Sequence, residues 1–198
     1  MKRLDFNSPA ILSFAIICFL VLVLSWITNG ASNRLLFSVY HSPLSDPFMY
    51  PRLFFHALGH ANMAHFVNNF MIILLIGPML EERYGAQSLI VMMVITAFIT
   101  GILHVIIAPI GVGKLGASGI VFMLILLSSF TNLKRGRIPI TLILILAIYL
   151  GREIHGSLTL DNNIAYMTHI VGGLCGALFG FVLNKDTWGE GFNENENV

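Results

Sequence analysis

The sequence carries very little charge for its length. Only 11% of its 198 residues are charged, whereas a soluble domain typically has about 25%. So few charged side chains cannot cover a surface that faces water. Hydrophobic residues make up 56% of the chain, and the mean hydropathy is +0.81. This composition excludes an ordinary soluble domain and predicts an integral membrane protein.

The chain also has few cysteines and a net charge close to zero. The two cysteines, Cys18 and Cys175, both lie in apolar stretches, which favours packing residues over a disulfide framework. The net charge of +1 gives no indication of nucleic-acid binding, and we expect no nucleic-acid partner. The lipid bilayer is the partner that the composition predicts.

Six apolar segments could form membrane helices, each of which needs about 20 apolar residues (roughly 17–25). They cover residues 11–28, 64–80, 88–107, 118–130, 140–150 and 165–183. The segments 118–130 and 140–150 are too short to span lipid alone, so we expect neighbouring helices to bury them. The pattern predicts an all-α polytopic membrane protein, with a six-helix membrane domain at 1–185 and a polar cytoplasmic tail at 186–198.

The first apolar segment could also be a signal peptide, because Met1-Lys2-Arg3 resembles an n-region. The apolar run is too long for a typical h-region, and Trp26-Ile27-Thr28 is a poor cleavage site. We therefore expect a retained helix. The connection at 29–55 contains three prolines, and a connection of this length usually has its own structure or a function.

The distribution of lysine and arginine predicts the orientation. Six helices place both ends of the chain on one side of the membrane. The flanks on that side hold seven basic residues: Lys2, Arg3, Arg83, Lys134, Arg135, Arg137 and Lys185. The opposite flanks hold four: Arg34, Arg52, Lys114 and Arg152. Because cytoplasmic loops are enriched in Lys and Arg, we expect both termini in the cytoplasm. The compact six-helix form without extra domains leads us to expect a bacterial inner (plasma) membrane.

His65 and Asn69 form the first informative polar pair. Four residues apart on a helix, they differ by about 40° in direction and share a face. Both side chains can donate a hydrogen bond to a developing oxyanion. They could equally hold the bundle together through interhelical hydrogen bonds. A metal site at His56, His60 and His65 is the weaker interpretation, because the chain has no His-Glu-x-x-His pattern.

Ser118 stands between small residues where a polar loop gives way to an apolar run. One interpretation is a small-residue face that lets helices pack closely. The other is a nucleophile, because a serine at a helix N-terminus lies beside free backbone N–H groups that can hold an oxyanion. The flanking Gly116 and Gly119 would let a substrate backbone come close.

His169 lies beside a stripe without side chains on the last apolar segment. Gly172, Gly176 and Gly180 recur every four residues, so this helix can approach a partner very closely. His169 is about 60° from Gly172 in direction. If the partner is the Ser118 helix, the approach brings an imidazole to a hydroxyl. Otherwise His169 is satisfied by a neighbouring carbonyl.

Together these motifs resemble the rhomboid family of intramembrane serine proteases, over nearly the whole chain up to Leu183. The resemblance rests on three motifs in the family's order: His65-x-x-x-Asn69, Gly116-x-Ser118-Gly119 and Thr168-His169-x-x-Gly172. The run Glu81-Glu82-Arg83-Tyr84-Gly85 is similar too. Arg52 matches the arginine of the family's Trp-Arg pair, and Pro51 stands where tryptophan is usual.

The resemblance implies a role for each residue. Ser118 would be the nucleophile and His169 its general base. His65, Asn69 and the Ser118 backbone N–H would form the oxyanion hole. Four residues would support these groups: Gly116, Gly119, Phe122, which would pack against the His169 ring, and Gly172.

The implied function is that of a serine endopeptidase that cleaves single-span membrane proteins near the outer membrane face, without a cofactor. We expect the segment 140–150 to move to admit the substrate, with a hinge at Gly151-Arg152. A non-catalytic six-helix protein, such as a pseudoprotease or a small transporter, would share the composition. A haem or metal protein would use His56, His60, His104 or His155. The oligomeric state is not indicated.

Overall fold

The computed structural model describes residues 6–130, 140, 143–144, 147–148 and 163–183. The helices of this part are α1 (Pro9–Ile27), the π-helix η1 (Asn33–Phe37), α2 (Met49–Phe55), α3 (Met63–Tyr84), α4 (Ala86–Ile107), α5 (Ser118–Phe130) and α7 (Asn163–Leu183). The only strand-like pairing within these residues is one antiparallel bridge between Val39 and Lys114. The predicted all-α class is therefore confirmed, and so is the prediction that residues 29–55 have structure of their own.

Among the residues that the structure describes, four helices are long and apolar enough to cross a membrane: α1, α3, α4 and the Tyr166–Leu183 part of α7. The predicted helix at 118–130 is confirmed as α5, and the other predicted spans extend by one to four residues in α3, α4 and α7. Of the predicted fifth helix, residues 140, 143–144 and 147–148 are helical, and the rest lies outside the described residues. The count of six spans stays a prediction, as does the tail at 186–198.

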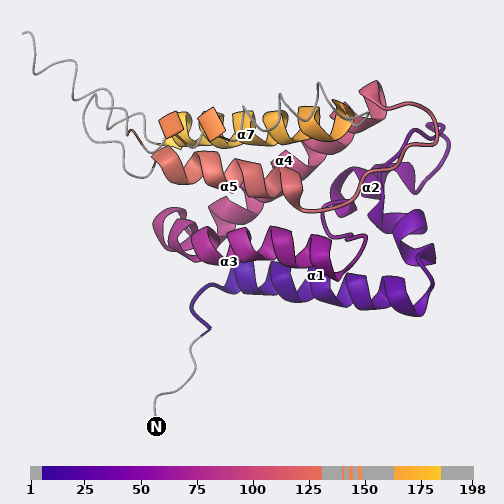
Figure 1. Cartoon of the computed structure of the whole chain (residues 1–198), viewed down its shortest axis with the longest axis horizontal. Coiled ribbons are helices and arrows are strands. Elements are labelled where there is room, and N and C mark those ends of the chain that lie inside the picture. Colours follow the sequence, from indigo (N-terminus) through magenta and orange to yellow (C-terminus); the bar gives the residue numbers. More distant parts are fainter. Residues whose placement is uncertain (1–5, 131–139, 141–142, 145–146, 149–162, 184–198) are drawn as a thin grey trace, which may run out of the picture.

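The short helix α5 packs against α3, α4 and α7. Figure 1 shows α5 and α7 side by side along one edge, α1 and α3 along the opposite edge, and α4 slanting between the pairs. Nine of the 13 residues of α5 are buried, and they point in all directions around the helix axis. A helix that is apolar all round belongs in a protein interior. This is how a helix too short to span lipid is accommodated.

Glu81 joins α3 to the start of α1. Its carboxylate oxygens accept hydrogen bonds from the backbone N–H groups of Ala10 (2.9 Å) and Ile11 (3.0 Å), and the side chain is only 6% exposed. The first N–H groups of a helix lack partners within it, and a carboxylate there is also favoured by the helix dipole. Glu81 therefore caps a helix that lies 70 residues away along the chain.

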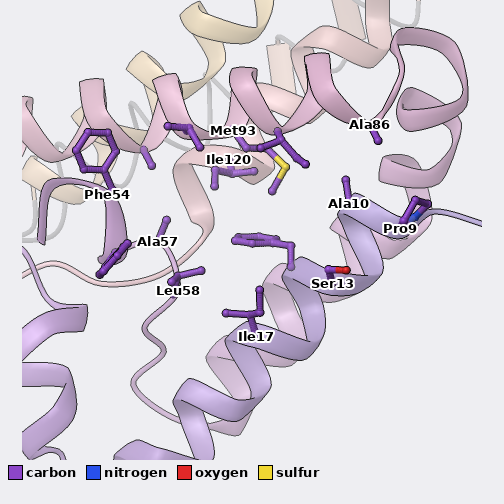
Figure 2. Close-up of a pocket in the computed structure, with 15 residues that line it drawn as sticks. Pro9, Ala10, Ser13, Ile17, Phe54, Ala57, Leu58, Ala86, Met93 and Ile120 are labelled. Carbon is purple, nitrogen blue, oxygen red and sulfur yellow. The ribbon is translucent and has the colours of Figure 1, made fainter. Parts of the chain in front are cut away.

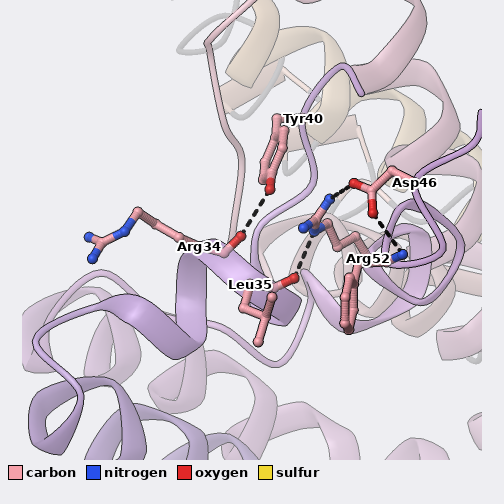
Figure 3. A network of polar contacts seen from close by, with 6 residues as sticks. Arg34, Leu35, Tyr40, Asp46 and Arg52 are labelled. Carbon is pink, nitrogen blue, oxygen red and sulfur yellow. Dashed lines mark hydrogen bonds and ion pairs between the residues drawn. The ribbon is translucent and has the colours of Figure 1, made fainter. Parts of the chain in front are cut away.

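Arg52 holds the first loop together. Its Nε donates to the carbonyl of Leu35 (2.8 Å), and its Nη1 pairs with Oδ2 of Asp46 (2.6 Å), as Figure 3 shows. The guanidinium also lies 4.4 Å from the centre of the Tyr40 ring. The Phe48 backbone N–H and the Arg52 guanidinium lower the pKa of Asp46. The Arg52 side chain, matched in the sequence to the arginine of the family's Trp-Arg pair, therefore has a structural role: it connects α2 to η1 and to Asp46.

Both cysteines are free and buried. Cys18 lies within α1 and Cys175 within α7, and both belong to the apolar core. The expectation that they are packing residues is confirmed.

Candidate active site

Backbone hydrogen bonds fix the loop that leads into Ser118. The N–H of Gly116 donates to the carbonyl of His56 (2.8 Å), and Lys114 and Val39 exchange two bonds of 2.9 Å. Gly116 has φ of +120°, a conformation that favours glycine. Ser118 then begins α5 and remains half-buried. Its hydroxyl is thus held at a helix N-terminus without being sealed inside the core.

His65 and Asn69 lie directly against Gly116. A methyl group on Gly116 would come within 2.6 Å of Cε1 and 2.7 Å of Nε2 of His65, and within 3.7 Å of Nδ2 of Asn69. The prediction that His65 and Asn69 share a face of one helix is confirmed. The close fit also explains the residue at 116, because a larger side chain would collide with the ring of His65.

His60 holds the amide of Asn69. Nδ1 of His60 lies 3.2 Å from the carbonyl of Leu58, which can only accept, so Nδ1 carries the hydrogen. Nε2 is then an acceptor, and it receives a hydrogen bond from Nδ2 of Asn69 at 3.2 Å. Burial first, and then the charge of His65, lower the pKa of His60 to about 4. A neutral His60 therefore orients the Asn69 amide and leaves its second N–H available.

The glycine stripe of α7 packs on α5. A methyl group on Gly172 would collide with the Gly119 carbonyl and lie 2.9 Å from its Cα. Gly176 lies in the same way against the backbone of Met123, and Gly180 against the Phe130 ring. The predicted close approach between this stripe and the Ser118 helix is confirmed. Backbone packs on backbone beside Ser118, so the spacing of the two helices there has little freedom.

The ring of His169 stacks on Phe122. The ring centres are 4.6 Å apart and the planes differ by 8°, as predicted. Tyr166 approaches the same imidazole edge-on at 6.5 Å. His169 also lies close enough to His65 for their charges to interact. The stacked Phe122 ring, the edge-on Tyr166 ring and the nearby glycine contact thus hold the imidazole on the α5 side of α7.

The eight residues singled out in the sequence come together at one place. Gly116 lies against His65 and Asn69, Gly119 against Gly172, and Phe122 against His169. Ser118 stands in the middle of these contacts on the first turn of α5. These contacts bring a hydroxyl, an imidazole and two side chains that can donate hydrogen bonds into one part of the bundle, and acyl transfer requires groups of these kinds.

Three further polar groups lie behind this loop, and the sequence did not single out their arrangement. His56 and His104 use Nε2 to bond the carbonyls of Ala97 (3.0 Å) and Val112 (3.1 Å). Their Nδ1 atoms and Nζ of Lys114 are buried and have no hydrogen-bond partner among the described residues. Burial lowers the pKa of His56 to about 3 and that of Lys114 to about 7.

The histidines considered for haem or metal binding are engaged otherwise. His56, His60 and His104 each bond a backbone carbonyl, and His155 lies outside the described residues. Within residues 6–130 and the other described ranges, no group of three or more His, Cys, Asp or Glu is placed to hold a metal ion.

Comparison with known proteins identifies one domain in the chain. The family model of the Rhomboid domain matches residues 47–186, which is more than two thirds of the sequence. The match begins in the first loop and contains all the residues of the site described above. A search of the curated proteins finds no match.

Proposed function

The chain belongs to the rhomboid family, and on this premise we propose that it is a serine endopeptidase that cleaves single-span membrane proteins. The family is in general one of intramembrane serine proteases, and it also includes pseudoproteases. The proposal rests above all on one observation: Ser118 begins α5 between Gly116, which lies against His65 and Asn69, and Phe122, which stacks on His169.

In the proposed reaction, Ser118 and His169 act as a dyad. Oγ of Ser118 attacks the scissile carbonyl while the imidazole of His169 takes its proton. The imidazolium then gives that proton to the leaving amine. Water hydrolyses the resulting acyl-enzyme in the same manner. Stacking on Phe122 orients the imidazole in this scheme, where the Ser-His-Asp triad uses a carboxylate.

Three donors would stabilise the negative oxygen of the tetrahedral intermediate: the backbone N–H of Ser118 and the side chains of His65 and Asn69. Losing one such donor typically lowers the rate by about 10²–10³. His60 supports Asn69 in this role, because it takes up one N–H of the amide and so directs the other. We assign His60 as a positioning residue.

The substrate would reach the site as an extended peptide. The carbonyls of a transmembrane helix are bonded within the helix, so a helical substrate must unwind locally before attack. Ser118 opens the outer end of its helix if the termini are cytoplasmic, as the distribution of Lys and Arg favours. We propose cleavage near the outer face of a bacterial inner membrane. The predicted moving segment, 140–150, lies largely outside the described residues.

The proposal is tested by cleavage of a fused single-span substrate in vesicles. We expect Ser118→Ala and His169→Ala to abolish cleavage. Ser128→Ala is the matched control, since this serine lies on the same helix and bonds the Ile125 carbonyl, and we expect nearly full activity. Cleavage by Ser118→Ala at the wild-type rate would disprove the proposal. A correctly folded wild type that cleaves none of a panel of single-span substrates would favour a pseudoprotease.

A further inference from the structure

A large apolar cavity opens between α1, α2 and α4. Its volume is about 620 Å³, and Figure 2 shows side chains from these helices surrounding it, with Ile120 of α5 among them. Of the 15 residues that line it, only Ser13 has a polar side chain. The cavity lies on the side of α5 away from the glycine contact, and no residue of the proposed catalytic machinery lines it.

The rim of the cavity is continuous with the lipid-facing surface. Ile17 on α1 and Val94 on α4 line the cavity, and they are 46% and 47% exposed. Both belong to candidate membrane spans. The opening therefore faces the hydrocarbon of the bilayer. Water is a poor occupant, because a buried water needs two to four polar partners and Ser13 is the only polar side chain there.

The size of the cavity, about 620 Å³, indicates the kind of occupant. Small-ligand pockets are typically about 300–1,000 Å³, so the cavity suits a slender apolar chain. The bilayer that surrounds it supplies such chains at high concentration.

We propose that this cavity binds one acyl chain of a membrane phospholipid. The chain would pack on Phe14 and Ile17 from one side and on Met93 and Val94 from the other. Its inner end would contact Ile120, two residues after Ser118. It would also contact Ala57, which follows His56, the residue whose carbonyl holds the Gly116 N–H. A bound lipid would thus support the first loop and the start of α5 from behind.

The test is photo-crosslinking in phosphatidylcholine vesicles that contain a small fraction of phosphatidylcholine with a diazirine in mid-chain. Mass spectrometry locates the labelled residues. The Ser118→Ala protein serves as the parent, so the result does not depend on the proposed protease activity. We expect labelling of cavity residues of α1 and α4 at least about 5-fold above that of Leu75 and Leu174, which are exposed outside the cavity.

Cavity-filling variants provide the matched comparison. Ser13→Trp and Val94→Trp each place a large ring in the cavity, and we expect both to reduce its labelling about 5-fold. Ile16→Trp and Val91→Trp are the controls, because these residues are exposed on the same helices but do not line the cavity. Equal labelling of all exposed residues, or equal labelling in filled and control variants, would overturn the proposal. Circular dichroism confirms that each variant is folded, and the parent's own labelling pattern decides if a variant is not.

Discussion

The two sides of α5 are packed in opposite ways. On one side the backbone of α7 lies directly on the backbone of α5, with Gly172 against Gly119. On the other side α1, α2 and α4 leave a cavity of about 620 Å³ beside Ile120. Gly119 and Ile120 are neighbours in sequence, so the difference falls within the first turn after Ser118. We call the contact between the glycine stripe of α7 and the backbone of α5 the seam. The seam sets the position of the proposed dyad, whereas the cavity on the opposite side leaves space that side chains do not fill.

A methyl group in the seam should have the largest effect. Gly172→Ala places a carbon against the Gly119 carbonyl, so α7 must move away and carry His169 with it. We expect cleavage to fall at least about 100-fold, with a loss of stability of about 1–3 kcal/mol, as is typical of overpacking. Substrate cleavage and thermal unfolding in detergent measure the two effects.

Gly173→Ala is the matched control for the seam. A methyl group there would lie 3.5 Å from the Leu126 side chain, an ordinary contact, so we expect near-wild-type behaviour. If both alanine variants behaved alike, the close approach at Gly172 would not determine the geometry of the site.

Removing the Glu81 carboxylate should weaken the side of the molecule that holds the cavity. Glu81→Ala leaves the N–H groups of Ala10 and Ile11 without their acceptor, and each unsatisfied buried group costs about 1–3 kcal/mol. We expect a lower melting temperature. Glu82→Ala, at an exposed neighbour, should leave the melting temperature unchanged, and an equal loss in both variants would refute the capping role.

A substitution of His60 alters the support of Asn69 in the proposed oxyanion hole. It changes neither the contact between α5 and α7 nor the cavity on the other side of α5, so it tests the site separately from both. His60→Phe keeps an aromatic ring but removes the acceptor for the Asn69 amide. We expect kcat to fall about 10-fold with KM nearly constant, since the oxyanion interaction is made only in the transition state.

A double-mutant cycle separates this positioning role from a packing role. If His60 acts through Asn69, then His60→Phe should add little to the effect of Asn69→Ala. Full additivity of the two effects on kcat would show that His60 acts independently of Asn69.

Lys114 should give the smallest effect, and one that depends on pH. Burial lowers its pKa to about 7 from an ordinary value of about 10.4, so the unfolded chain binds this proton more tightly. The stability that Lys114 contributes is therefore lowest below about pH 7 and rises as the pH approaches about 10. We expect Lys114→Met to raise the melting temperature more at pH 6 than at pH 9.

The control for Lys114 is Arg34→Met, which removes an exposed cation from the first loop. Its effect should be small and independent of pH. A gain from Lys114→Met that is the same at both pH values would mean that the ammonium is hydrated in the folded protein.

The seam was predictable from the sequence, and the support around the site was not. Glycines at 172, 176 and 180 define a stripe by helical periodicity alone, and His65 and Asn69 define a face in the same way. The cap from Glu81 to α1 joins residues 70 positions apart, which no local pattern reveals. His60 lies in the irregular segment before α3, where helical periodicity gives no direction, so its bond to Asn69 required coordinates.

The central claim is that Ser118 is a nucleophile activated by His169, and covalent labelling tests it most directly. A serine-reactive fluorophosphonate is incubated with the purified protein in detergent, and the modified peptide is identified by mass spectrometry. The account predicts a single phosphonylated residue, Ser118, with labelling lost in His169→Ala and retained in Ser128→Ala. Labelling at another serine, or labelling of Ser118 that is just as fast without His169, would contradict it.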